Sequence, residues 1–223
     1  MASSLPRLRN LSVSAKAKSP SKSAKTWHQM GSRPLARAFF ARPATEVARD
    51  LLGKVLVHKL DGHTLAGRIV ETEAYLGGGD LAAHAARGLT PRTKVLFGPP
   101  GHAYVYFIYG MYECLNFVCE QDGTAGCVLI RALEPVAGIE EMKKRRPAAR
   151  RLRDLTSGPG KLTLAMGITR QHYGCDLTQG TLQVREFENT VPNEIVVAKR
   201  IGISVSKDLP LRFHIKDNEF VSR

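Results

Sequence analysis

The alternation of apolar and polar positions predicts short strands with a few helices between them. Apolar residues recur at helical spacing over positions 47–52 and predict a helix, and a strand follows over residues 54–60. The Asp61-Gly62 pair is a hairpin turn signal, so "LAGRIVETEAY" is expected to return antiparallel to that strand. The chain then enters a loop rich in Gly, Arg and Thr, at residues 77–96.

The second half of the pattern is also dominated by strands. "GHAYVYFIYGMYECLNFVCE" predicts two strands that turn at Tyr109-Gly110, and "GCVLIRALEP" predicts another that ends at Pro135. "AGIEEMKKRRPAARRLRDL" predicts a basic helical region interrupted at Pro147, and "SGPGKLTLAMGI" predicts a turn and a short helix. Short strands follow in "NEIVVAKRIGISVS" and "LRFHIKD". Because hairpins join most strands, we expect an α+β fold with an antiparallel sheet.

The formal net charge of +13 is concentrated at the start of the chain. Residues 1–45 hold nine Lys and Arg residues and no Asp or Glu, so the remainder carries only +4. We therefore expect a basic, low-complexity, disordered tail over residues 1–33 and one domain over residues 34–223. Such a tail suits a polyanion, and a solubilising extension or an organellar transit peptide fits the same composition.

Composition disfavours several other classes. No apolar run approaches the roughly 20 residues that span a bilayer, so no membrane partner is expected. The four cysteines form no CxxC pair and no zinc-ligand spacing, and we expect no metal, no cofactor and a reducing compartment. "SGPGKL" places backbone amides and Lys161 at a helix start, which favours an anion, but its spacing is not that of a nucleotide-triphosphate loop.

Candidate chemistry centres on the predicted strand "GRIVETEAY". Alternate side chains of a strand share a face, so Ile69, Glu71, Glu73 and Tyr75 are expected to point the same way. Two carboxylates roughly 6 to 7 Å apart raise each other's proton affinity, and such a pair can supply a general base and a general acid. An edge strand with two solvated glutamates explains the same spacing.

Aromatic residues near this strand favour a planar ligand. Tyr109, beside Gly110, is expected at a hairpin tip, where an exposed ring can wedge between stacked bases. Tyrosines that line a pocket can stack on a base, and His84 is a candidate for a further wall. Packing in a core, with the hydroxyl at the surface, explains Tyr104 equally well. Basic side chains of the loop, such as Arg92, add a phosphate-binding face.

Several long blocks together resemble one known family. "GRIVETEAYLG", "TPR", "YVYFIYGMYECLN", "CVLIRALEP" and "SGPGKL" resemble, in order, the alkyladenine (3-methyladenine) DNA glycosylase family of the human type, from about Pro34 to the C-terminal end. The resemblance implies a single α+β domain with a mainly antiparallel, curved sheet, flanking helices and a protruding β-hairpin. It also implies a monomer that works on double-stranded DNA inside the cell, in the cytoplasm or nucleoid of a bacterium or the nucleus or an organelle of a eukaryote.

The activity implied by this resemblance is monofunctional. Such an enzyme flips alkylated or deaminated purines (3-methyladenine, hypoxanthine, ethenoadenine) out of the duplex and hydrolyses the N-glycosidic bond, which starts base excision repair. Glu73 matches the glutamate that deprotonates the attacking water, and Arg131 matches the arginine that helps to hold this water. Tyr75, His84 and Tyr106 match the residues that stack against the flipped base.

Further matches are expected at the edge of this site. Asn116 matches the asparagine that crowds the 2-amino group of guanine, and Tyr109 matches the hairpin tyrosine that fills the vacated stack. Ile201 matches a position whose backbone carbonyl contacts the water. Charge, rather than the resemblance, makes Arg92 and Lys161 candidate phosphate contacts.

Two rival functions remain open. A bifunctional glycosylase with lyase activity would need an amine nucleophile such as Lys161. A protein that binds duplex DNA could insert Tyr109 without any chemistry, although the presence of Glu73 and Arg131 argues against it. Glu71 has no matched role, and we expect it to make hydrogen bonds near the site. Gly160 departs from the serine that is common in relatives.

Overall fold

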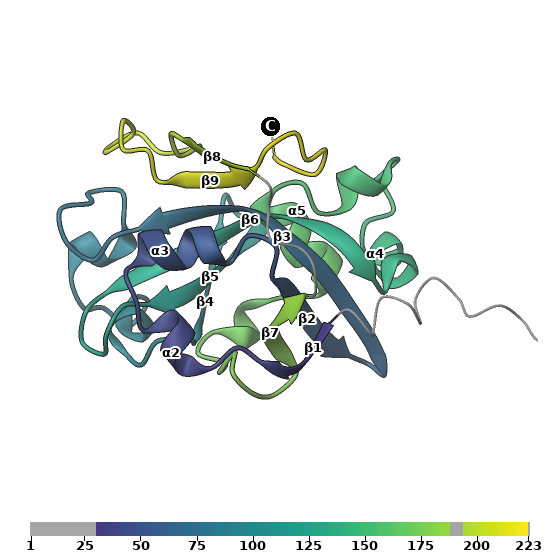
Figure 1. The fold of residues 1–223 in the computed structure, drawn as a ribbon, viewed down its shortest axis with the longest axis horizontal. Helices are drawn as coiled ribbons and strands as arrows, with labels where there is room; N and C mark the ends of the chain where they lie inside the picture. Colours follow the sequence, from purple (N-terminus) through teal and green to yellow (C-terminus); the bar gives the residue numbers. More distant parts are fainter. Residues whose placement is uncertain (1–29, 188–193, 223) are drawn as a thin grey trace, which may run out of the picture.

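The computed structural model describes residues 30–187 and 194–222 of the chain (Figure 1). In this part of the chain, strands form one sheet of antiparallel pairs in the order β1-β7-β2-β3-β6-β5-β4, and β9 attaches β8 to β3. The strands are β1 (Met30–Pro34), β2 (Val55–Leu60), β3 (His63–Tyr75), β4 (Ala103–Ile108), β5 (Tyr112–Cys119), β6 (Gly126–Ala137), β7 (Leu182–Phe187), β8 (Ile195–Ala198) and β9 (Arg212–Ile215).

Short helices flank the curled sheet, so the predicted α+β class with an antiparallel sheet is confirmed. Helix α3 packs on β3 and β6, and α5 packs on β5 and β6, which buries the main hydrophobic core between helices and sheet. The α-helices are α2 (Arg37–Phe40), α3 (Ala44–Asp50), α4 (Ile139–Arg145) and α5 (Pro159–Met166). Single 3₁₀ turns are η1 (His84–Arg87), η2 (Lys94–Phe97), η3 (Leu152–Leu155) and η4 (Arg170–His172).

The start of the domain differs slightly from the prediction. Most of the expected tail lies outside the described residues, but Met30–Pro34 forms β1 and pairs with β7. The sheet therefore begins before Pro34. The predicted helix over residues 47–52 corresponds to α3, which begins after Pro43 and ends at Asp50. A proline at this position suits a helix start, since it has no N–H to donate.

Strand β3 carries the two candidate carboxylates, and its pairing with β6 shifts register between Ile69 and Thr72. Ile69 packs in the main core together with Ala74, whereas Glu71 and Glu73 both reach Arg131. The prediction that Ile69 shares their face is therefore wrong, because a bulge reverses which alternate residues share a face. For the two glutamates the shared face is confirmed, and both are fully buried rather than solvated.

Strand β6 continues to Ala137, two residues past its predicted end at Pro135. Proline normally ends a strand inside a sheet because it cannot donate a ladder hydrogen bond. Strand β5 pairs with β6 only as far as Leu129, so at Pro135 the second edge of β6 has no strand beside it. Because no neighbouring strand needs a hydrogen bond from Pro135 on that edge, its missing N–H is tolerated and β6 continues.

Two hairpins complete the site. The β4–β5 hairpin turns at Tyr109 and Gly110 as predicted, and both have positive φ, at 53° and 68°. The β8–β9 pair, yellow in Figure 1, lies along β3, where β9 pairs with residues 71–73. Since β2 pairs with β3 only as far as Arg68, β9 takes over the same edge of β3 beside the glutamates.

Candidate active site

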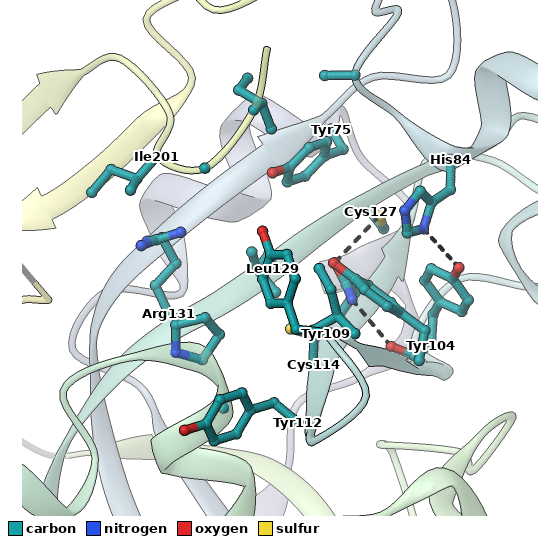
Figure 2. Close-up of a pocket in the computed structure, with 18 residues that line it drawn as sticks. Tyr75, His84, Tyr104, Tyr109, Tyr112, Cys114, Cys127, Leu129, Arg131 and Ile201 are labelled. Carbon is teal, nitrogen blue, oxygen red and sulfur yellow. Dashed lines mark hydrogen bonds between the residues drawn. The ribbon is translucent and has the colours of Figure 1, made fainter. Parts of the chain in front are cut away.

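A cavity of about 310 Å³ opens where four strands meet the segment that follows β8. Side chains from β3, β4, β5 and β6 form its walls, and residues 201–203 close one side (Figure 2). A volume of this order is typical of a pocket for a small planar ligand. The predicted site residues that line it are Tyr75, His84, Tyr106, Tyr109, Asn116, Arg131 and Ile201.

Glu73 is fully buried and is not among the residues that line the cavity, and three donors bind its carboxylate. The Tyr75 hydroxyl donates to Oε2 at 3.0 Å, and the Ile201 backbone N–H donates to Oε1 at 2.8 Å. The Arg131 guanidinium is 3.1 Å from the same Oε1. All three donors belong to residues that line the cavity. Glu73 is therefore connected to the cavity through every one of these contacts.

Burial raises the pKa of Glu73, and the charge of Arg131 and the Ile201 N–H only partly offset it. A carboxylate with a raised pKa is a stronger base than a solvated one, while its donors still favour the ionised form. Burial and the neighbouring Glu73 charge also raise the pKa of Tyr75, so its hydroxyl stays protonated and remains a donor. Glu73, with Tyr75 as a hydrogen-bond donor, is suited to accept a proton from a molecule in the cavity.

Glu71 makes the hydrogen bonds that the sequence led us to expect. It accepts from Arg131 Nε at 3.1 Å and from Arg212 Nη1 at 3.0 Å through one oxygen. The Ser222 backbone N–H donates to its other oxygen at 2.7 Å. Arg131 thus bridges both glutamates, and although burial disfavours its charge, Glu73 and Glu71 outweigh this and raise its pKa. Residues near the end of the described chain complete this network.

Aromatic rings form the opposite walls. The ring centroids of His84 and Tyr106 are 4.6 Å apart, and the two ring planes make an angle of 71°. His84 Nδ1 is 2.8 Å from the Tyr104 hydroxyl, which fixes the orientation of the imidazole (Figure 2). Burial and the nearby Arg92 lower the pKa of His84 to about 4, so its ring is uncharged at neutral pH. Uncharged aromatic walls favour stacking of a planar base.

Asn116 is buried on β5 with both ends of its amide engaged. Its Nδ2 donates to the Tyr104 carbonyl at 3.2 Å, and Cys127 Sγ donates to its Oδ1 at 3.8 Å. Because the two contacts are of opposite kinds, they fix which end of the amide is which. Asn116 therefore presents a rigid polar group to the cavity.

Tyr109 lies at the tip of the β4–β5 hairpin and is 74% exposed, as its position beside Gly110 predicted. The rest of the tip is also apolar and open, with Met111 61% exposed. The hairpin is anchored close to its tip, since the Thr163 hydroxyl on α5 donates to the Glu113 carbonyl and Arg170 pairs with the Glu113 carboxylate. A rigid hairpin thus presents a large ring to the exterior.

The structure relates three other predicted residues to the cavity in different ways. Ile201 uses its backbone N–H toward Glu73, and its expected carbonyl contact with water stays a prediction. The guanidinium of Arg92 lies 5.1 Å from the Tyr106 ring centroid, behind the wall of the cavity. Lys161 is exposed in the first turn of α5 and does not line the cavity. Phosphate contacts by Arg92 and Lys161 also stay predictions.

An ion pair that sequence reasoning missed supports the Tyr75 wall. Arg200 donates to both carboxylate oxygens of Asp80, at 2.6 and 2.7 Å, and both residues are buried. Its guanidinium carbon lies 4.5 Å from the Tyr75 ring centroid. The only available signal was an arginine directly before Ile201, because 120 residues separate the partners.

Three features are absent from the part of the chain that the structure describes. No group of three or more His, Cys, Asp or Glu side chains there is arranged to hold a metal ion. Its four cysteines are free thiols. None of its helices combines the length and the apolar character needed to cross a bilayer.

Comparison with known proteins shows the family to which the chain belongs. The family described as Methylpurine-DNA glycosylase (MPG) matches residues 38–219. A protein of Alkaliphilus oremlandii, named "Putative 3-methyladenine DNA glycosylase", is 50% identical over 200 residues, which cover 85% of this chain and 98% of that protein. A protein of the same name from Methanoculleus marisnigri is 52% identical over 192 residues, again 85% and 98% of the two chains.

The fold, the site and these likenesses define a DNA glycosylase, a hydrolase that acts on N-glycosidic bonds. Its work is the repair of alkylated bases, and its substrate is DNA. The chain belongs to the methylpurine-DNA glycosylase family.

Proposed function

We propose that this protein flips alkylated or deaminated purines, namely 3-methyladenine, hypoxanthine and ethenoadenine, out of duplex DNA and into the aromatic cavity. There it hydrolyses the N-glycosidic bond with a water molecule activated by Glu73. One observation carries the proposal: the Glu73 carboxylate is held beneath the cavity by donors from Tyr75, Ile201 and Arg131.

Extrusion of the base is the first selective step. Unstacking and unpairing cost a few kcal/mol, and they cost least at a damaged or mispaired base. Tyr109, exposed on its anchored hairpin, is the side chain suited to fill the space that the base leaves. The extruded purine then stacks among Tyr75, His84 and Tyr106, while Asn116 disfavours a purine with a 2-amino group.

The negative charge of the Glu73 carboxylate promotes hydrolysis in two ways. As the glycosidic bond stretches, positive charge develops on the sugar, and the buried Glu73 carboxylate stabilises it. Glu73 accepts a proton from water, and the resulting hydroxide forms a bond to the anomeric carbon as the bond to the purine nitrogen breaks. Arg131 orients the carboxylate. A cationic purine departs directly, whereas a neutral purine must also gain a proton.

The position of Lys161 disfavours a lyase. An amine nucleophile has to reach the anomeric carbon from within the site. Lys161 is exposed at the first turn of α5 and does not line the cavity. The product we expect is therefore an abasic site in an unbroken strand.

End-labelled duplexes with a single hypoxanthine or ethenoadenine test this function. Each is incubated with the protein in the absence of added metal, and half of every sample is then heated in alkali. We expect strand breaks only after alkali. Breaks without alkali would indicate a lyase, and tight binding with no breaks under either condition would indicate a binding protein.

A further inference from the structure

One face of the Tyr75 ring carries a charged group, Arg200, which does not line the cavity and which the proposed reaction does not need. Arg200 lies over that ring at 4.5 Å, and its guanidinium is held by Asp80 in a two-pronged contact. The Ala74 carbonyl also accepts from Arg200 Nη1 at 3.1 Å. This geometry fixes the guanidinium against one face of Tyr75, and the ring also lines the cavity.

Asp80 is held as firmly as its partner. Besides the two bonds from Arg200, its carboxylate accepts from the backbone N–H groups of Leu76 and Ala82, both at 3.1 Å. Burial favours the protonated form of Asp80, but the bonds from Arg200 and these amides outweigh it and lower its pKa. Arg200 and Asp80 are therefore both charged, and the pair is close to neutral as a unit.

A cation on one face of an aromatic ring changes what the other face can bind. The attraction of a cation to a ring comes from the negative charge above and below its plane. Arg200 already draws on this charge from behind, so a second cation on the cavity side meets a weaker attraction and a direct repulsion. A neutral purine stacks on the same face without that penalty. Asp80 reduces the penalty because it offsets the charge of Arg200.

We propose that the Asp80–Arg200 pair sets the preference of the cavity between cationic and neutral purines through Tyr75. This inference rests on the proposed function and deepens it, since it assigns selectivity to two positioning residues that do not touch the base. Removing the charge of Arg200 should favour cationic purines. Removing the charge of Asp80 leaves Arg200 unbalanced and should favour neutral purines.

The test compares two excision rates for each variant. Release of cationic 3-methyladenine from DNA methylated with dimethyl sulfate is measured beside release of neutral hypoxanthine from a duplex, both with enzyme in excess and on the pH plateau. The ratio of the two rates cancels any loss that is common to both substrates. For Arg200→Gln we expect the cationic-to-neutral ratio to rise about fivefold, and for Asp80→Asn we expect it to fall about fivefold, a change of the size that one cation–π contact contributes.

Arg200→Lys is the matched control, because it keeps the positive charge and loses only the planar guanidinium that contacts both oxygens of Asp80. Its ratio should stay within about twofold of wild type. If Asp80→Asn does not melt cooperatively, the contrast between a raised ratio in Arg200→Gln and a nearly unchanged ratio in Arg200→Lys carries the test. Ratios that move in the same direction in the Gln and Asn variants, or do not move, would overturn the inference. Wild-type protein that releases neither base would instead overturn the proposed function.

Discussion

The Tyr75 hydroxyl donates a hydrogen bond of 3.0 Å to the Glu73 carboxylate, two positions away on the same strand. Tyr75 therefore makes two contacts: its ring lines the cavity, and its hydroxyl holds the buried Glu73 carboxylate. The bulge before Glu71 makes this possible, because it directs the glutamates away from the main core. In the proposed function, this single side chain couples the chemistry to the binding of the substrate.

Replacing Glu73 with glutamine should abolish excision and leave lesion binding intact. The amide keeps the shape of the carboxylate but cannot accept a proton from water. We expect the single-turnover rate to fall by about 10² to 10⁴-fold, the usual contribution of a general base. Gel-shift affinity for a hypoxanthine duplex should stay close to wild type. An unchanged excision rate would remove Glu73 from the mechanism.

Tyr75→Phe should change the pH dependence more than the maximal rate. The substitution keeps the ring and removes the hydrogen bond that lowers the pKa of Glu73, so this pKa, already raised by burial, rises further. The acidic limb of the excision profile should therefore move to higher pH. Rates from pH 5 to 9 for wild type and variant measure the shift. Coincident profiles would mean that the hydroxyl does not act on Glu73.

Asn116→Ala should relax the exclusion of guanine. The variant removes the rigid amide that is held between the Tyr104 carbonyl and Cys127 Sγ, and a 2-amino group then meets open space. Excision of guanine from a mismatched duplex should become measurable. The Tyr104 carbonyl loses one hydrogen bond and Cys127 Sγ loses its acceptor, so a stability loss of about 1–3 kcal/mol should accompany the change. If guanine is still rejected by the folded variant, discrimination lies elsewhere.

Tyr109→Ala should weaken the flipped state. The exposed ring at the hairpin tip is lost, and the vacated stack stays empty. Stacking of a base on an aromatic ring is worth about 1–3 kcal/mol, so excision should slow by roughly tenfold, most clearly for a well-paired lesion. Tyr109→Phe keeps the ring and should behave like wild type. Equal rates for the alanine variant on paired and mispaired lesions would count against the wedge.

Acid should destabilise the fold through one buried histidine, His58, and one half-buried histidine, His84. Burial lowers the pKa of His58, and burial with Arg92 lowers that of His84 to about 4. In the unfolded chain both histidines bind a proton near pH 6.5, whereas in the folded chain they bind it only at lower pH. The free energy of unfolding therefore decreases as pH falls below about 6.5. For His84 this loss continues to about pH 4.

Melting temperatures between pH 7.5 and 5 measure this effect. Wild type should lose stability with falling pH more steeply than His58→Gln or His84→Gln, because each variant lacks one of the two histidines whose pKa is lowered by folding. The comparison with wild type cancels the contribution of Glu73, whose raised pKa acts in the opposite direction. Parallel curves for all three proteins would contradict the prediction.

Much of the fold followed from local signals. The hairpin at Tyr109 and Gly110 was evident because alternating strands surround residues that tolerate positive φ. The site residues came from the resemblance, whereas periodicity alone could place Glu73 and Tyr75 on one face but could not say which glutamate acts. The error at Ile69 arose because a bulge leaves no reliable mark in the spacing of apolar residues.

Contacts between distant segments were out of reach of the sequence. Asp80 and Arg200 lie 120 residues apart, and Glu71 and Ser222 lie 151 apart. Nothing local distinguishes such a partner from a solvated surface charge. These long-range pairs surround the carboxylates. The residues that hold the site in place were therefore less predictable from the sequence than the site residues themselves.

The bond between the Ser222 amide and Glu71 also has a consequence during synthesis on the ribosome. Strands β2 to β7 can emerge and assemble while β9 and the residues after it are still inside the exit tunnel. Until then Glu71 lacks Arg212 and Ser222, and Arg131 alone must neutralise two buried carboxylates. The network around Glu71 and Glu73 is therefore completed by residues that are synthesised after the strands that carry the two glutamates and Arg131.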